Sequence, residues 1–186
     1  MKLFEIMLVA LGCAATAAPM SAVPLEIDPQ QSKIEVAVSC TMDSFVGHLE
    51  KFQTTIECNA SEPLPAKAEV HFDFGDLKTG DKDRDLAMLK WLGYETNPTA
   101  SFRLTTWTQT GSTNIAQGQL IIHGVTAVVQ IPVAITRDQN AWDISGQAVV
   151  DCRDFKLPKI RKALVLSVNP KLKVKFRLVG KTVAPQ

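Results

Sequence analysis

The segment Lys171-Leu172-Lys173-Val174-Lys175-Phe176-Arg177-Leu178 decides the fold class. Cationic and apolar side chains alternate along it without a break. Successive side chains of a β-strand point to opposite faces, so a period of two predicts a strand with one buried face and one face in water. On a helix the same apolar residues would be spread around the surface.

The same alternation recurs along the chain and predicts seven earlier strands. A further segment, 86–92, predicts a helix, with Asp83 or Asp85 as its cap and Pro98 blocking any continuation. Eight antiparallel strands with short turns favour a closed barrel or a sandwich, because closure removes exposed edges. We therefore expect an all-β, eight-stranded antiparallel barrel with one flanking helix. The seven earlier strands are expected at 34–40, 52–58, 68–74, 100–104, up to 122, 125–135 and 142–150.

Composition supports one folded, soluble domain. The 186 residues are 46% hydrophobic and 21% charged, with a formal net charge of +1. A disordered chain would be poorer in apolar residues and further from charge balance. Beyond the N-terminus no apolar run approaches the roughly 20 residues of a membrane span. A charge near zero gives no basic footprint for nucleic acid.

The N-terminal residues 1–22 have the layout of a secretory signal peptide: Lys2, an apolar core over 6–11 and small residues over 14–22. Cleavage is expected after Ala17 or Ala22. The domain would then span 23–186 and work in the periplasm or outside the cell. Lipid attachment at Cys13 is the weaker alternative, because Ala10 stands where a lipobox has Leu.

The inward faces of the predicted strands are apolar and almost free of charge. An eight-stranded barrel is just wide enough to be filled by side chains or to hold one small ligand, and the pattern leaves both open. A guest in such a lumen would be aliphatic, since burial gains roughly 0.8 kcal/mol per CH₂. The predicted ligand-binding residues are Val36, Val38, Phe52, Ile56, Val70, Phe72, Phe102, Leu104, Val129, Ile131, Val150, Val174 and Phe176.

Cys40, Cys58 and Cys152 share the inward parity of their strands. An odd number leaves at least one thiol unpaired. A hairpin turning near 43–47 would set Cys58 far along the strand from Cys40, beyond the roughly 7 Å between Cα atoms that a disulfide allows. Pairing of either with Cys152 stays open, and three buried thiols are slightly favoured.

Motifs of catalysis are missing from the sequence. There is no nucleophile elbow, phosphate-binding loop or dinucleotide fingerprint. His48, His71 and His123 are scattered, so we expect no catalytic residue, metal or cofactor. Two polar clusters remain, at 79–85 and 153–162. The first is expected to be a solvated helix entry that an Arg84–Asp pair holds. The second lies in a long predicted loop with Phe155, Leu157 and Ile160 among its basic residues. A solvated, locally basic loop is the simpler interpretation of it, and contact with a lipid headgroup or a membrane surface is the alternative. The candidate headgroup residues are Arg84, Lys156, Lys159 and Arg161.

Five short motifs in order resemble the YceI-like family of lipid- and polyisoprenoid-binding proteins of the bacterial periplasm, over about 27–178. The chain departs from the family pattern at Ala87 and Ala127, where His and Lys are common. The motifs are Asp28-Pro29 with Ser32, Thr79-Gly80 with Arg84-Asp85, Asn97-Pro98-Thr99-Ala100-Ser101-Phe102, Gly118-Gln119-Leu120-Ile121-Ile122-His123-Gly124-Val125-Thr126, and Arg153-Asp154-Phe155.

This resemblance implies a lipocalin-like barrel that binds a long amphiphilic lipid in a tunnel and has no catalytic site. We therefore expect non-enzymatic carriage or sequestration of a polyisoprenoid, isoprenoid quinone or fatty-acid derivative. Two alternatives stay open: a ligand-free structural or stress-response interaction module, and a hydrolase or redox enzyme that uses Cys or His. The sequence does not settle the oligomeric state, and a homodimer is compatible with it.

Overall fold

The computed structural model describes residues 22–41, 44–59, 62–162 and 166–183, with the side chains of 161, 162 and 166 outside the description. The predicted signal peptide and Cys13 lie outside the described residues. The elements are β1 Ala22–Ile27, β2 Lys33–Ser39, β3 Ser44–Leu49, β4 Gln53–Asn59, β5 Pro65–Asp73, η1 Phe74–Asp76, β6 Leu77–Lys78, α1 Lys82–Leu92, β7 Thr99–Thr110, β8 Thr113–Ile122, β9 Val125–Asp138, β10 Ala141–Asp151, η2 Cys152–Phe155, β11 Arg161–Lys162, β12 Leu166–Ser167 and β13 Lys171–Thr182.

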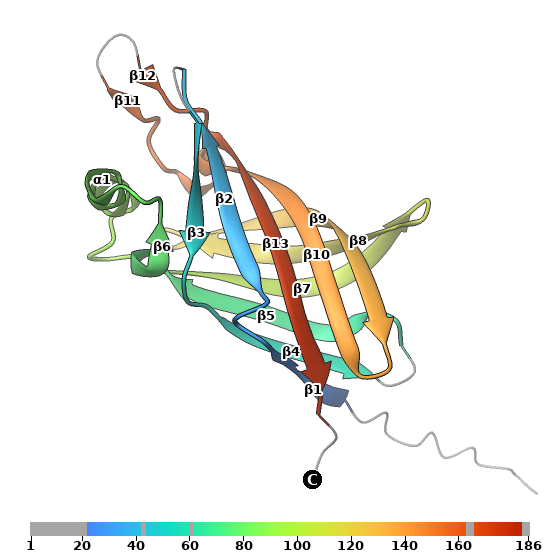
Figure 1. Ribbon diagram of the computed structural model, residues 1–186. Helices are drawn as coiled ribbons and strands as arrows, with labels where there is room; N and C mark the ends of the chain where they lie inside the picture. Colours follow the sequence, from blue (N-terminus) through green and yellow to red (C-terminus); the bar gives the residue numbers. More distant parts are fainter. Residues whose placement is uncertain (1–21, 42–43, 60–61, 163–165, 184–186) are drawn as a thin grey trace, which may run out of the picture.

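The strands form a closed, eight-stranded antiparallel barrel with one helix, as predicted. The ring runs β1-β4-β5-β7-β8-β9-β10-β13 and closes through β1–β13. A branch of the same sheet continues from β13 through β2 and β3 to β6. Figure 1 shows β2, β13 and β10 running steeply in front, and β5, β7 and β8 crossing behind them. The barrel is therefore two crossed layers around one interior.

Three of the predicted strands, β2, β4 and β5, are each one part of a longer strand that a kink divides in two. β1 and β2 follow one another along the same edge of β13. β4 pairs with β1 and β5, while β3 pairs with β2 and β6. The two parts of each kinked strand (β1 with β2, β3 with β4, and β5 with β6) occupy one position in the ring. The chain therefore runs up and down between neighbouring positions. The sequence missed β1, β3 and β6 because their apolar alternation is short.

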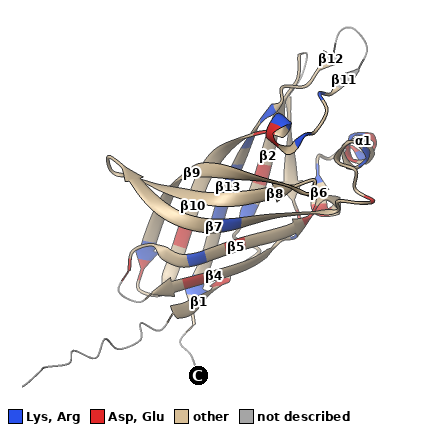
Figure 2. Ribbon diagram, turned by 180° about the vertical axis from the view of Figure 1, so that it is seen from behind, with Lys and Arg blue, Asp and Glu red and all other residues tan. Residues whose placement is uncertain are grey.

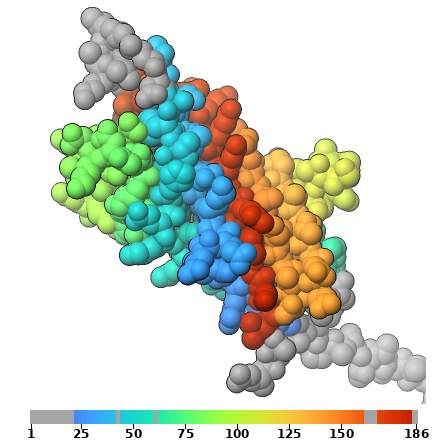
Figure 3. Space-filling view, in the orientation of Figure 1, coloured from blue at the N-terminus to red at the C-terminus, as the bar shows by residue number. Residues whose placement is uncertain are grey.

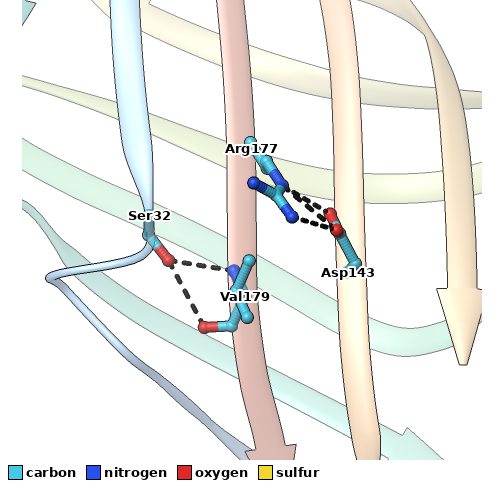
Figure 4. A network of polar contacts seen from close by, with 4 residues as sticks. All are labelled: Ser32, Asp143, Arg177 and Val179. Atoms are coloured by element: carbon cyan, nitrogen blue, oxygen red, sulfur yellow. Dashed lines mark hydrogen bonds and ion pairs between the residues drawn. The ribbon is translucent and has the colours of Figure 1, made fainter. Parts of the chain in front are cut away.

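Strand β13 is the centre of this arrangement. It pairs with β10 over its whole described length on one edge, and with β2 and then β1 on the other. Ser32, in the kink between β1 and β2, accepts a hydrogen bond from the Val179 amide at 2.9 Å and donates to the Val179 carbonyl at 3.3 Å (Figure 4). Beside it, Arg177 and Asp143 form a bidentate ion pair, with Nη2 and Oδ2 2.7 Å apart.

The closure needs a glycine. Gly180 lies opposite Ile27 of β1 and Trp142 of β10. A Cβ at this position would collide with the backbone carbonyl of Glu26. A glycine in a strand often marks such a close backbone approach, which makes Gly180 the steric condition for joining β1 to β13.

One stretch of the wall is not joined by backbone hydrogen bonds. β9 and β10 pair from Ala141↔Asp138 only as far as Gly146↔Val133. Beyond that point residues 125–132 of β9 pair with β8 alone, and 147–151 of β10 pair with β13 alone. We call this divergence of the two strands the seam.

The helix starts earlier than predicted. The Asp81 side chain caps it by accepting from the Arg84 amide at 3.0 Å, so neither Asp83 nor Asp85 is the cap. Asp85 instead accepts from the Thr79 amide and hydroxyl, at 2.9 and 2.6 Å. At the other end Gly93 takes a left-handed conformation and ends the helix before Pro98 is reached.

The predicted loop between the last two long strands is partly ordered by local structure. It contains η2 and a small ribbon of β11 and β12. Phe155 and Leu157, which were expected to reach a headgroup or membrane, are 1% and 6% exposed. That expectation is wrong for these two side chains, because apolar residues of a short 3₁₀ turn are buried against the barrel.

We expect Gly180→Ala to lower the free energy of unfolding by about 3 kcal/mol, because the new methyl group overpacks the closure. Gly111→Ala is the matched control. Gly111 has φ 60° but open space around it, so only the backbone cost of about 1 kcal/mol applies. Urea unfolding followed by circular dichroism measures both, and equal losses would contradict the steric role of Gly180.

Candidate functional site

The barrel interior is the candidate site, and its described core contains no buried polar or charged residue. The predicted ligand-binding residues are distributed along it. Ile56 and Val150 are buried and the other eleven are half-buried. Their binding role stays a prediction, but their positions divide them into three groups.

The first group belongs to a lower cluster, at the end of the barrel where β1 meets β13 in Figure 1. Phe52, Leu104, Ile131 and Phe176 pack against it, and Ile56 is part of it. This cluster fills one end of the barrel with side chains. Its buried members are Leu25, Ile56, Cys58, Ala116, Val133, Trp142, Ile144 and Leu178.

The second group belongs to an upper cluster, beneath α1 and η2. Val150 is part of it, and Phe72 and Val174 pack against it. Both short helical elements contribute, so this end of the barrel is covered as well as filled. Its buried members are Phe74, Leu92, Ala100, Val150, Cys152, Phe155 and Leu157.

The third group belongs to neither cluster, and we call it the waist: Val36, Val38, Val70, Phe102 and Val129. All are half-buried, although strand pairing places them on the same face as interior residues such as Val174 and Gly118. Apolar side chains that face inward yet keep accessible surface are what an incompletely filled interior produces.

Two glycines shape the interior, and the sequence prediction did not include them. A Cβ at Gly118 would collide with the Phe102 ring, and one at Gly146 would come within 2.8 Å of the Phe176 ring. Each ring therefore occupies the space that a side chain at the neighbouring strand glycine would fill. Glycine inside a strand pattern was the signal that could have identified this close packing.

A groove of about 800 Å³ lies on the outer wall, and its chemistry differs from that of the interior. Lys33, Glu35, Lys175 and Arg177 are among its lining residues, together with Ser112 and its neighbours at the β7–β8 turn. Figure 3 shows β2 and β13 side by side on this front face. Such a charged lining does not suit an aliphatic chain.

The candidate headgroup residues gather at the upper end without forming one cluster. Arg84 lies 4.3 Å from the centroid of the Phe45 ring and 3.7 Å from an Asp81 oxygen. Phe45 is opposite Val38, so this cation stands near the interior. Lys156 and Lys159 are exposed on the η2 loop. The Arg161 side chain lies outside the described residues.

The most specific sequence motif is structural. His123 and Gly124 form the two-residue turn between β8 and β9, with φ of 51° and 69°, as a type I′ turn requires. The His123 Nδ1 lies 2.9 Å from the Leu92 carbonyl at the end of α1. Trp91 Nε1 donates to Pro158 at 2.8 Å, and the Tyr94 hydroxyl donates to Asp73 at 2.8 Å. These contacts fasten α1 over the upper end.

The lower end contains one unsatisfied donor. Trp142 Nε1 is buried and has no hydrogen-bond partner among the described residues. Trp107 Nε1, which packs beside the same cluster, donates to Pro65 at 2.9 Å. The Arg137 guanidinium covers the Trp142 ring, 4.9 Å from its centroid. An unpaired buried N–H costs about 1–3 kcal/mol, which the burial of the large indole ring and the cation–π contact offset.

Titratable groups do not assemble into reactive chemistry in the described part of the chain. No group of three His, Cys, Asp or Glu comes together there as metal ligands. Cys58 lies in the lower cluster and Cys152 in the upper one, so a bond between these two is excluded. Burial raises the pKa of each thiol to about 11. Cys40 pairs through its backbone with Val168.

Comparison with known proteins identifies a family and a fold. Residues 25–180 match the model of the YceI-like domain. Burkholderia cenocepacia BcnA is similar in structure, with a TM-score of 0.71, 20% identity, and coverage of 83% of this chain and 99% of that one. A polyisoprenoid binding domain from Saccharophagus degradans, implicated in plant cell wall breakdown, gives a TM-score of 0.66 at 13% identity, covering 88% and 100%.

The Campylobacter jejuni YCEI protein gives a TM-score of 0.56 at 13% identity, covering 75% of this chain and 85% of that one. No curated protein matches the chain. At these identities the structural matches establish the fold alone.

We expect Cys58 and Cys152 to resist alkylation by iodoacetamide at pH 8 in the native protein. With a pKa near 11, only about a thousandth of each thiol is thiolate at that pH, and burial blocks access as well. Peptide mass spectrometry after brief labelling, with and without urea, measures this. Rapid labelling of either residue without urea would show that its cluster opens.

We expect the stability that Asp151 provides to disappear in acid. Its carboxylate accepts from Arg153 at 2.9 and 2.5 Å, and this bond lowers its pKa to about 2. A lowered pKa gives stability that is complete above the unfolded value near 4 and is lost as the pH falls to about 2. Urea unfolding should therefore show a gap between wild type and Asp151→Asn at pH 7 that closes by pH 2. The exposed neighbour Asp154→Asn should keep the wild-type pH dependence.

Proposed function

The chain belongs to the YceI-like domain family, and from that premise we propose that it binds an apolar-tailed lipid inside its barrel and catalyses no reaction. The ligand class is a polyisoprenoid, an isoprenoid quinone or a fatty-acid derivative. The observation that carries the proposal is the waist, where inward apolar side chains keep accessible surface and belong to neither packed cluster.

An aliphatic chain is the guest that matches this lining. The waist contributes valine and phenylalanine side chains only, and the described core has no buried polar group to pair with a charged ligand. Each methylene moved from water into such surroundings gains roughly 0.8 kcal/mol. A chain of several isoprene units therefore binds through its length, with no need for a specific polar contact along it.

The polar head of the ligand is proposed to stay at the upper end. Arg84 of α1 lies there over the ring of Phe45, and Phe45 is on the interior face of β3. Lys156 and Lys159 are exposed nearby on the loop that Trp91 holds through Pro158. These cations suit a phosphate or carboxylate head, which a guanidinium or ammonium group binds well when partly shielded from water.

We propose that the protein works in the periplasm or outside the cell after removal of residues 1–22, as a carrier or a sequestering protein. Within the described part of the chain no helix is long and apolar enough to cross a membrane. The homologue from Saccharophagus degradans is described as a polyisoprenoid binding domain, which supports the proposed ligand class.

The direct test is extraction of the purified protein with organic solvent followed by mass spectrometry, together with titration of a long-chain isoprenoid quinone. Quenching of tryptophan fluorescence reports binding, because Trp107 and Trp142 lie at the lower cluster. Co-purifying lipid or saturable quenching supports the proposal. Failure of both would leave the ligand-free module as the better interpretation.

A bulky residue at the waist should compete with the lipid tail. We expect Val129→Phe to weaken quinone binding by at least tenfold, because its ring occupies about the volume of several methylene groups. The control is Gln130→Phe, the next residue of β9, whose exposed side chain points to the outer face. Both variants should fold, as circular dichroism will show. Equal affinities would place the ligand outside the waist.

A further inference from the structure

A lipid needs a route into this barrel, and both ends of it are packed. The lower cluster fills one end, and the upper cluster fills the other beneath α1 and η2. Three hydrogen bonds from Trp91, Tyr94 and His123 fasten α1 and its C-terminal turn in place. In the part of the chain that the structure describes, packed side chains therefore occupy both ends, and the wall itself must be considered.

The seam between β9 and β10 is a gap in the backbone hydrogen bonding of that wall. Pairing stops at Gly146↔Val133, after which β9 keeps only β8 and β10 keeps only β13 as neighbours. Among the described residues no other strand pairs with the two edges that face the seam. Opening it would break no ladder of backbone bonds, unlike opening between any fully paired strands.

Side chains of the η2 segment close the seam from within. Phe155 and Leu157 are buried in the upper cluster, Val125 and Ala127 of β9 pack against the same cluster, and η2 contacts β9. The segment itself is attached to the barrel by a few bonds, including that of the Cys152 amide to the Pro170 carbonyl at 2.9 Å. Apolar packing is non-directional, so a lipid chain can replace these side chains without leaving polar groups unpaired.

The outer rim of the seam has one strongly exposed valine on each strand. Val128 on β9 is 64% exposed and Val149 on β10 is 56% exposed, one on each side of the divergence. Leu86, on the outer face of α1, is the other described apolar side chain with comparable exposure, at 66%. Leu86 therefore marks the rival route, over the helix.

Positive charge surrounds one side of this rim. Val149 lies directly opposite Lys173, and Asp151 lies opposite Lys171. Arg153, Lys156 and Lys159 are exposed on the adjoining segment, which Figure 2 shows between β10 and β11. Against these five cations stand two carboxylates, Asp151 and Asp154, and Asp151 is already bonded to Arg153. Exposed valines with excess cations beside them are a combination that an anionic membrane surface attracts.

We propose that the seam is the face with which this protein docks on an anionic membrane, and that the lipid passes between β9 and β10 as the η2 side chains give way. This proposal rests on the proposed function, because it supplies the route for the same ligand. It places uptake on the side of the barrel, with the headgroup of the lipid near the membrane surface and its tail at the waist.

The test measures transfer of a long-chain isoprenoid quinone from vesicles to the protein by stopped-flow tryptophan quenching. The vesicles are phosphatidylcholine alone or phosphatidylcholine mixed with phosphatidylglycerol. We expect faster transfer from the anionic vesicles. Lys171→Gln with Lys173→Gln should weaken binding to them by about 30-fold, since each lysine near an anionic surface contributes roughly a fivefold factor. Val128→Ser with Val149→Ser should slow transfer by about tenfold from either vesicle.

The matched controls lie on α1. Leu86→Ser tests an apolar side chain of equal exposure, and Lys82→Gln with Lys90→Gln tests two exposed cations. The substituted side chains are all exposed, so each variant should bind quinone in solution with the affinity of the wild type. Slower transfer in the helix variants, with normal rates in the seam variants, would overturn the proposal in favour of the helix route.

Two further outcomes are distinguishable. If the wild type takes up no quinone from solution, the proposed function fails, whatever the vesicles show. If it takes up quinone but sedimentation shows that the seam variants abolish a dimer of the wild type, the seam edges pair with a second copy, and the docking proposal is overturned while the function stands.

Discussion

The structure depends on one strand, β13, which joins the two halves of the sheet. One edge of β13 pairs with β10, and its other edge pairs first with β2 and then with β1. Two small residues make this sharing feasible. Ser32 bonds to both backbone groups of Val179 and so fixes the kink between β1 and β2, and Gly180 leaves room for the Glu26 carbonyl. Without closure the sheet would expose two strand edges, which invite aggregation.

The same barrel divides its apolar residues between stability and function. The buried members of the lower and upper clusters are packed as a core is, whereas the waist residues and the half-buried residues beside the clusters keep accessible surface. A filled end is needed because a barrel open at both ends would lose its core to water. The proposed binding of a lipid tail uses the apolar surface of the interior that the two clusters leave accessible. Function and stability therefore compete for the same interior volume.

The motifs shared with the family serve the architecture. His123 and Gly124 form a tight turn and hold the end of α1, and Asp85 binds the Thr79 backbone before the helix. Phe155 contributes its ring to the upper cluster. These polar and aromatic residues are spread along the chain because each fixes a different junction. Among the described residues, none of them forms a reactive constellation with another.

The sequence by itself determined the eight positions of the barrel, the inward and outward faces of its long strands and the class of the fold. Alternation over segments such as 171–178 is local, and it depends only on the direction of successive side chains along a strand. The tertiary structure decided what no local pattern contains. The kinked strands β1 and β3, the burial of Phe155 and Leu157, the packing of Phe102 over Gly118 and the seam at Gly146 all depend on partners distant in sequence. Whether an inward residue fills the barrel or lines a space is likewise a property of the volume that all strands enclose together.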